Sequence, residues 1–197
     1  MVSSRRAQPY RVIAADPPWK FGDSLPGPKR GAARHYDVLS VEQIQRFPIP
    51  PIADDAILFL WRVAAMQREA LDVCVAWGFE PKSEIVWAKT SSANVTAVFV
   101  ASGVGLSYGM GRYCRGAHEV CIVARRGRYK VKDAGARSIF FAPRREHSRK
   151  PDDFYDIIKR MTGDDGPKLD LFAGEPRKNW TAFGELGRMA KHAEGGR

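Results

Sequence analysis

Short apolar runs bounded by polar, glycine or proline residues recur along the chain and predict β-strands. The expected strands are residues 10–15, 56–61, 83–89, 118–124, 138–141, 169–172 and, at a sheet edge, 180–183. Helical spacing of apolar residues predicts helices at 40–46, 64–77 and 151–161. Strands that alternate with helices are typical of a mostly parallel sheet covered on both faces. We therefore expect an α/β fold, a Rossmann-like three-layer sandwich.

Two stretches interrupt this pattern and are expected to be surface loops. Residues 22–34 are rich in glycine, proline and basic residues, and residues 90–116 contain five glycines. Long loops in a compact domain are usually functional or disordered. We expect both to be flexible and regard 22–34 as a candidate lid.

The length of 197 residues and the hydrophobic fraction of 44% suit one domain. We expect a single domain over 1–197, with flexible tails at 1–9 and 188–197. No stretch approaches the roughly 20 apolar residues of a membrane span, and residues 1–11 lack the apolar core of a signal peptide. We therefore expect a cytosolic protein without a membrane partner.

The net charge of +10 favours a polyanionic partner such as nucleic acid, although many basic proteins have none. The three cysteines form no CxxC pair, so neither a zinc site nor a disulfide framework is indicated. Three basic runs are candidate phosphate contacts: Lys29-Arg30 with Arg34, the run from Arg125 to Lys132, and Arg144-Arg145. Any one of them is more often a solvated surface.

The first predicted strand runs directly into Asp16-Pro17-Pro18-Trp19. Two prolines remove two backbone donors and fix two φ angles, so the carboxylate, the carbonyls and the indole ring are held in place. Acceptors beside an aromatic face suit a planar ligand with an exocyclic amine. The alternative is a proline-stiffened turn with a core tryptophan.

A second candidate site lies at Lys168 to Gly174, where an apolar strand carrying Asp170 runs into small residues. Nucleotide-like cofactors bind at such strand ends, although strand-to-glycine turns occur in every α/β protein. Lys150 precedes the helix predicted to begin at Pro151, where it can neutralise a ligand carboxylate. A solvated basic loop is the equally plausible alternative.

Tryptophans end two further predicted strands. In a parallel sheet Trp19, Trp61 and Trp87 meet at one edge together with Lys89, an arrangement that suits a nucleobase and its phosphate. The alternative is that these rings are ordinary core. A lone pair such as His118-Glu119 at the start of a strand is more often structural than catalytic or metal-binding.

Taken together, these motifs resemble the adenine N6-methyltransferases related to the catalytic subunit of messenger-RNA adenosine methyltransferase, particularly small bacterial and phage members. The resemblance covers roughly residues 10–186. It rests on these segments: Ala15 to Trp19, Tyr36 with Ser40, Leu58 to Trp61, Trp77 to Phe79, Glu84 to Lys89, His118-Glu119, His147 to Asp152, Leu169 to Phe172, and Asn179-Trp180. It implies a permuted methyltransferase sheet, with the catalytic motif before the cofactor motif.

The resemblance also implies S-adenosylmethionine as cofactor and nucleic acid as substrate. We expect DNA rather than RNA as that substrate, and no metal. The implied catalytic residues are Asp16, Pro17, Pro18 and Trp19. The expected cofactor residues are Asp16, Lys150, Asp170, Phe172, Gly174, Arg177, Asn179 and Glu185. The expected substrate residues are Trp19, Tyr36, Trp61, Trp87, Lys89 and Glu119.

Two departures from the family pattern concern the cofactor. Gly174 stands where family members usually carry arginine, and Gly184-Glu185-Leu186 stands where they carry Gly-Asn and a polar residue. Arg177 is the candidate to replace the missing cation, and Glu185 to accept the ribose hydroxyls. The alternatives left open are the same reaction on RNA and a non-catalytic nucleic-acid-binding relative. A homodimer or a partner subunit is compatible with either.

Overall fold

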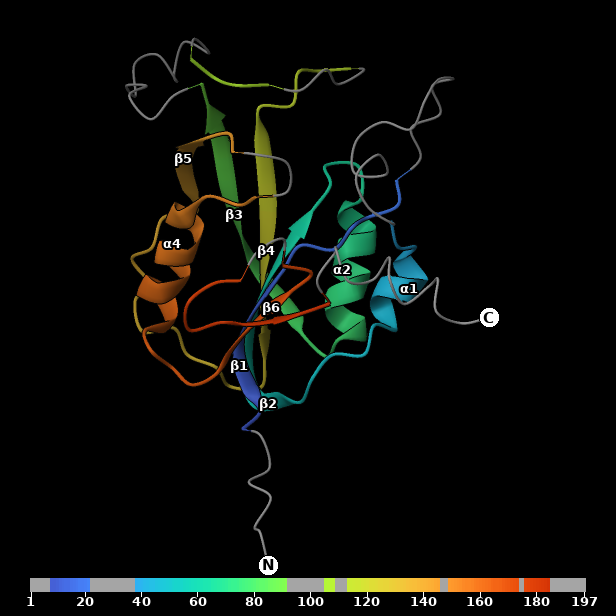
Figure 1. Ribbon diagram of the computed structural model, residues 1–197, viewed down its shortest axis with the longest axis vertical. Coiled ribbons are helices and arrows are strands. Elements are labelled where there is room, and N and C mark those ends of the chain that lie inside the picture. Colours follow the sequence, from blue (N-terminus) through green and yellow to red (C-terminus); the bar gives the residue numbers. More distant parts are fainter. Residues whose placement is uncertain are drawn as a thin grey trace, which may run out of the picture.

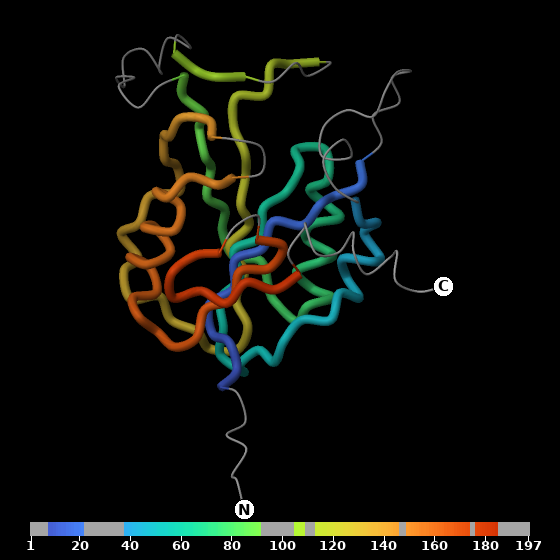
Figure 2. The backbone as a smooth tube through the Cα atoms, in the orientation of Figure 1, coloured from blue at the N-terminus to red at the C-terminus, as the bar shows by residue number. Residues whose placement is uncertain are grey.

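The computed structural model describes residues 8–21, 38–91, 105–108, 113–145, 149–173 and 176–184. These residues build a seven-stranded sheet in the order β5-β3-β4-β2-β1-β6-β7. The strands are β1 (Tyr10–Ala15), β2 (Ile52–Arg62), β3 (Glu80–Thr90), β4 (His118–Arg126), β5 (Ile139–Pro143), β6 (Lys168–Leu171) and β7 (Thr181–Phe183). All seven predicted strands are present, β2 and β3 being longer than expected. In Figure 2 the red C-terminal strands return beside the blue β1, far away in sequence.

Strand direction follows the expectation with one exception. Four neighbouring pairs are parallel, and the two pairs made by β4 are antiparallel. The sheet is therefore mixed but mostly parallel. Because β4 runs against β2 and β3, its first residues lie at the edge where the other strands end.

Helices lie on both faces of the sheet (Figure 1). Helices α1 (Val41–Gln45) and α2 (Gln67–Ala76) cover one face, and α4 (Asp152–Thr162) covers the other. Alternate residues of β1 divide between the two cores: Ile13 packs with the α1 and α2 side, whereas Val12 and Ala14 pack with Phe154 and Ile158 of α4. This alternation, with a period of two residues, is what a strand buried on both faces requires.

Local signals explain the helix ends. The Ser40 side chain accepts from the Gln43 backbone N–H, and the Gln43 side chain accepts from the Ser40 N–H, which is a capping box for α1. Gly78 follows α2 with a φ of +79°, where a side chain would be strained. Pro151 is the N-cap of α4, not its first helical residue as expected. No described helix combines the length and apolar character that crossing a membrane requires.

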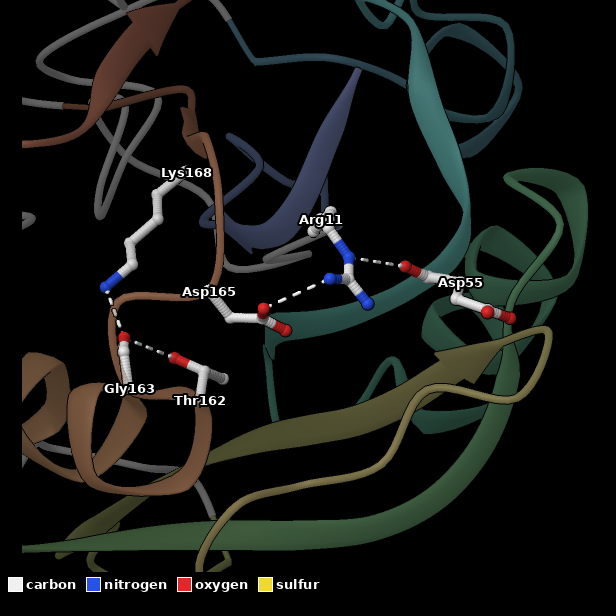
Figure 3. A network of polar contacts seen from close by, with 6 residues as sticks. All are labelled: Arg11, Asp55, Thr162, Gly163, Asp165 and Lys168. Carbon is white, nitrogen blue, oxygen red and sulfur yellow. Dashed lines mark hydrogen bonds and ion pairs between the residues drawn. The ribbon is translucent and has the colours of Figure 1, made fainter. Parts of the chain in front are cut away.

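The sheet edge where β1 and β6 begin is tied by polar contacts (Figure 3). Arg11 Nη1 donates to Asp165 Oδ1 at 3.0 Å, and Lys168 Nζ donates to the Gly163 carbonyl at 2.8 Å. The Thr162 hydroxyl also contacts that carbonyl at 3.4 Å. The end of α4 is thereby anchored beside β6, opposite the edge where the predicted site residues lie.

Several predictions fall outside the described residues. These are the candidate lid at 22–34, most of the loop 90–116, and the residues Tyr36, His147, Ser148, Gly174 and Glu185.

Candidate active site

The Asp16-Pro17-Pro18-Trp19 loop is fixed by backbone hydrogen bonds on both sides. The Asp16 N–H donates to the Leu171 carbonyl at 3.3 Å, which continues the pairing of β1 with β6. The Trp19 N–H donates to the Pro17 carbonyl at 2.8 Å, and the Leu39 N–H to the Pro18 carbonyl at 2.8 Å. A carbonyl oxygen has two lone pairs, so, as far as the described residues go, Pro17 keeps one acceptor position within a loop whose shape is already set.

An alternating row of charged side chains crosses this edge. Lys150 Nζ lies 2.8 Å from Asp16 Oδ2 and 3.1 Å from Glu119 Oε2. Lys89 Nζ lies 2.7 Å from Glu119 Oε1. The Lys150 side chain is only 11% exposed, so its ammonium is held mainly by the two carboxylates. The reversed direction of β4 is what brings Glu119 between the two lysines.

Burial and these neighbours shift the pKa values in different directions. Burial raises the pKa of Asp16 above its usual value, and the Lys150 ammonium opposes this only in part. For Glu119, burial acts in the same direction, but Lys150 and Lys89 outweigh it and lower the pKa to about 2. Burial lowers the pKa of Lys150, whereas Asp16 and Glu119 raise it to a net value above the ordinary one. Glu119 and Lys150 therefore stay charged at neutral pH.

The three predicted tryptophans lie at this edge but in two separate cores. Trp61 and Trp87 pack edge to face with ring centroids 6.5 Å apart on the α4 side. Trp19 belongs to the opposite core, and its indole N–H donates to the Trp61 carbonyl at 3.0 Å. Each residue is at most 4% exposed. The Lys150 ammonium lies 5.0 Å from the Trp61 ring centroid, so this ring also contacts the charged row.

A cavity of about 310 Å³ opens over the Asp16 loop. Predicted residues on its wall include Asp16, Trp61, Glu119 and Lys150. Five further residues line the cavity that no sequence motif had indicated: Phe21, Arg62, Val63, Ala64 and Val120. Arg62 to Ala64 come directly after the predicted strand end at Trp61, and Phe21 follows shortly after the Asp16 to Trp19 loop; this nearness to the predicted site residues was the available signal. The volume is at the lower end of the range for small-molecule sites, about 300–1,000 Å³.

The predicted cofactor strand ends in an unusual backbone turn. Phe172 has a φ of +62° and donates its N–H to the Phe183 carbonyl at 2.9 Å, and Asn179 has a φ of +66°. Non-glycine residues rarely adopt this conformation, and such strain concentrates at functional sites. Phe172 itself is buried against the Phe47 ring, at a centroid distance of 4.4 Å.

Asp170 and Arg177 contact α4. The Tyr155 hydroxyl donates to Asp170 Oδ2 at 2.9 Å, and Arg177 Cζ lies 3.6 Å from the Tyr155 ring centroid. Arg177 Nη1 also lies 2.8 Å from Asp152 Oδ1. Arg177 and Asn179 line a second cavity of about 420 Å³ between α4 and residues 176–180, whereas Asp16 and Lys150 line the first. The described members of the predicted cofactor set are therefore divided: two line each cavity, and Asp170 and Phe172 line neither of the two.

The two basic runs that the structure describes lie at opposite edges of the sheet, and the run at Lys29, Arg30 and Arg34 falls outside the described residues. Arg125 and Arg126 end β4, at the edge opposite the cavity, because that strand is reversed. Arg144 and Arg145 follow β5 at the cavity edge, where Arg145 Nη2 lies 2.7 Å from Asp152 Oδ2. Among the described residues, no three His, Cys, Asp or Glu side chains group as metal ligands.

Comparison with known proteins yields matches over most of the chain. The model of the MT-A70 family matches residues 10–186. The chain is 31% identical over 182 residues to the N(6)-adenosine-methyltransferase catalytic subunit METTL3 of Homo sapiens, covering 89% of this chain and 28% of that protein. It is 29% identical over 199 residues to the type II methyltransferase M.MunI of Mycoplasma sp, covering 89% of this chain and 76% of that protein. The chain therefore spans less than a third of the human relative.

Proposed function

Because the chain belongs to the MT-A70 family, we propose that it transfers a methyl group from S-adenosylmethionine to the N6 amine of adenine in DNA. The observation that carries this proposal is the Asp16-Pro17 pair of acceptors on the cavity wall, with Lys150 bound to the same carboxylate. The order of the chain agrees with it, because the catalytic loop precedes β6 as in a permuted methyltransferase sheet.

The donor set at this edge fits the proposed cofactor. S-adenosylmethionine carries a carboxylate, an ammonium and a sulfonium, so its site needs both a cation and acceptors. Lys150 supplies the cation and Asp16 an acceptor within 2.8 Å of each other. Phe172 and Asn179, with their left-handed backbone, and Asp170 are the further residues that we propose at the cofactor. When bound, the cofactor supplies an electrophilic methyl group.

The residues of the chain would act by orienting the amine. The lone pair of the adenine amine is delocalised into the ring, which makes it a poor nucleophile. Acceptance of its two hydrogens by the Asp16 carboxylate and the free lone pair of the Pro17 carbonyl draws the nitrogen toward a geometry able to attack. Fixed acceptors contribute mainly through positioning and through stabilising the charge that develops on the amine. No covalent enzyme intermediate is needed.

The proposed substrate is a base taken out of its stack. A base inside a duplex cannot reach a cavity, so it has to be flipped out. DNA is favoured because the type II methyltransferase is matched over 76% of its length, whereas most of the human adenosine methyltransferase has no counterpart in the match. The net charge of +10 suits either nucleic acid.

A product analysis tests the proposal. The protein is incubated with cofactor labelled on the methyl group and with single-stranded or duplex DNA or RNA, which is then digested to nucleosides. We expect label on N6-methyladenine from DNA. Label found only with RNA would make RNA, in place of DNA, the substrate. Label on cytosine, or on no nucleoside, would refute the proposed activity. Asp16→Asn should abolish transfer, whereas Asp133→Asn, which breaks a surface contact with Arg160, should not.

A further inference from the structure

We propose that Arg62 forms a binding site for a phosphodiester of the nucleic-acid strand whose base enters the cavity. This inference rests on the proposed function and adds an anion subsite to it. Arg62 is the last residue of β2, directly after Trp61, and it lines the same cavity as Asp16.

The guanidinium of Arg62 is buried and poorly satisfied. Its side chain is 8% exposed, and its Nε has no hydrogen-bond partner among the described residues. Its two contacts are long: Nη2 lies 3.4 Å from Glu84 Oε1, and Nη1 lies 3.5 Å from the Ala64 carbonyl. Good guanidinium–carboxylate contacts measure about 2.7–2.9 Å. A buried cation with unused donors is costly unless an acceptor arrives.

Glu84 is a weak competitor for this cation. Its side chain is 43% exposed, so water can solvate the carboxylate if the guanidinium turns to another acceptor. The contrast with Lys150 is clear, because Lys150 has two close carboxylate partners. The described wall of the cavity therefore holds one cation, Lys150, with two close carboxylates, and a second cation, Arg62, whose described carboxylate partner is the more distant Glu84.

The position of Arg62 suits the backbone of a strand whose base reaches Asp16. In the ladder Arg62 pairs with Val120, and Ala15 pairs with Leu60 on the same β2 strand. The cavity thus runs from the Asp16 loop across β2 to Val120 and His118, which line it as well. A planar fork of N–H donors matches a phosphate, whose contacts fix the register of the strand without reading its sequence.

Three charge-neutralising variants test the site by binding of a fluorescent adenine-containing oligonucleotide at several salt concentrations. Arg62→Gln should weaken binding about tenfold and reduce the slope of log K against log salt by about one. Arg125→Gln is the matched control, since Arg125 also lies loosely beside a β3 glutamate, 3.6 Å from Glu80, but at the opposite edge. It should change binding less than twofold. Glu84→Gln should leave binding unchanged or tighten it.

A purely structural Arg62–Glu84 pair predicts a different pattern. Replacing either partner would then lower the free energy of unfolding by a similar amount. Neither replacement would alter the slope of log K against log salt. Because Arg62→Gln itself could misfold, a second measurement uses wild-type protein with oligonucleotides in which single phosphates near the target adenine are replaced by neutral methylphosphonates. One replacement should weaken binding about tenfold, and Arg62→Lys should change the size of that loss. No sensitive phosphate would overturn the proposal.

Further measurements distinguish a nucleic-acid phosphate from the cofactor carboxylate as the anion at Arg62. They also distinguish failure of this site from failure of the proposed function. Isothermal titration of Arg62→Gln with S-adenosylmethionine should give wild-type affinity, and weaker cofactor binding would instead assign Arg62 to the cofactor carboxylate. If wild-type protein methylates DNA but Arg62→Gln behaves as Arg125→Gln, the phosphate site alone is wrong. If wild-type protein neither binds nor methylates any nucleic acid, the proposed function fails and the phosphate site fails with it.

Discussion

The Glu119 carboxylate joins two lysines, and its replacement should measure how strongly the charged row holds the fold. The pKa of Glu119 falls from its usual 4.5 to about 2, because Lys150 and Lys89 outweigh its burial. At about 1.4 kcal/mol per pH unit, this corresponds to about 3 kcal/mol of favourable interaction. Glu119→Gln should therefore lower the free energy of unfolding at pH 7 by about 3 kcal/mol.

The same reasoning fixes the pH dependence of that loss. A carboxyl whose pKa is lower in the folded protein stabilises it above the unfolded pKa and loses this contribution as pH falls through the folded value. The difference between wild type and Glu119→Gln should therefore be fully present above pH 5 and fall to roughly half at pH 3. Urea denaturation at both pH values measures it.

A surface glutamate with two cationic partners is the control. Glu80 lies beside Lys82 and Arg125, but its side chain is 65% exposed, so solvent screens the interactions. Glu80→Gln should change stability little. A fall of less than about 1 kcal/mol in the free energy of unfolding of Glu119→Gln at pH 7 would refute an interaction of about 3 kcal/mol between Glu119 and the two lysines. A fall of the same size at pH 7 and pH 3 would refute it as well.

Three further predictions concern single contacts. The methylation rate should fall as pH drops through the pKa of Asp16, which burial raises above its usual value; a pH–rate profile without an acidic limb would contradict this. Trp19→Phe removes the indole N–H that binds the Trp61 carbonyl and should cost about 1 kcal/mol of stability in urea denaturation; no loss would mean that water replaces the donor. Tyr155→Phe leaves the buried Asp170 without that hydroxyl and should lower the thermal midpoint by a few degrees, as about 1–3 kcal/mol implies.

The positions of the strands could be predicted from the sequence because a buried strand requires a short run of apolar residues, and such runs are visible in the sequence. The Asp16 loop could be placed at a strand end for the same reason, and the structure confirms that β1 ends at Ala15. The burial of Trp19 could not be predicted from the loop alone. Which core receives the ring depends on the Leu39 segment and the Trp61 carbonyl, both distant in sequence.

The Arg62 subsite illustrates a second limit. Arginine commonly follows an apolar strand, and in that position it is expected to be exposed to solvent. Its interest arises from a buried Nε without a partner and from two long contacts, neither of which is a property of the sequence alone.

The direction of β4 is the feature on which the site depends most, and an apolar run carries no sign of its direction. If β4 ran parallel to its neighbours, Glu119 would lie at the opposite edge, and Arg125 and Arg126 would lie near the cavity. Lys150 would then keep only Asp16, and Lys89 would lose its 2.7 Å partner. Without Glu119, less would oppose the lowering of the Lys150 pKa by burial. The reversal thus explains both why a lone His118-Glu119 pair becomes part of the site and why the longest basic run is excluded from it.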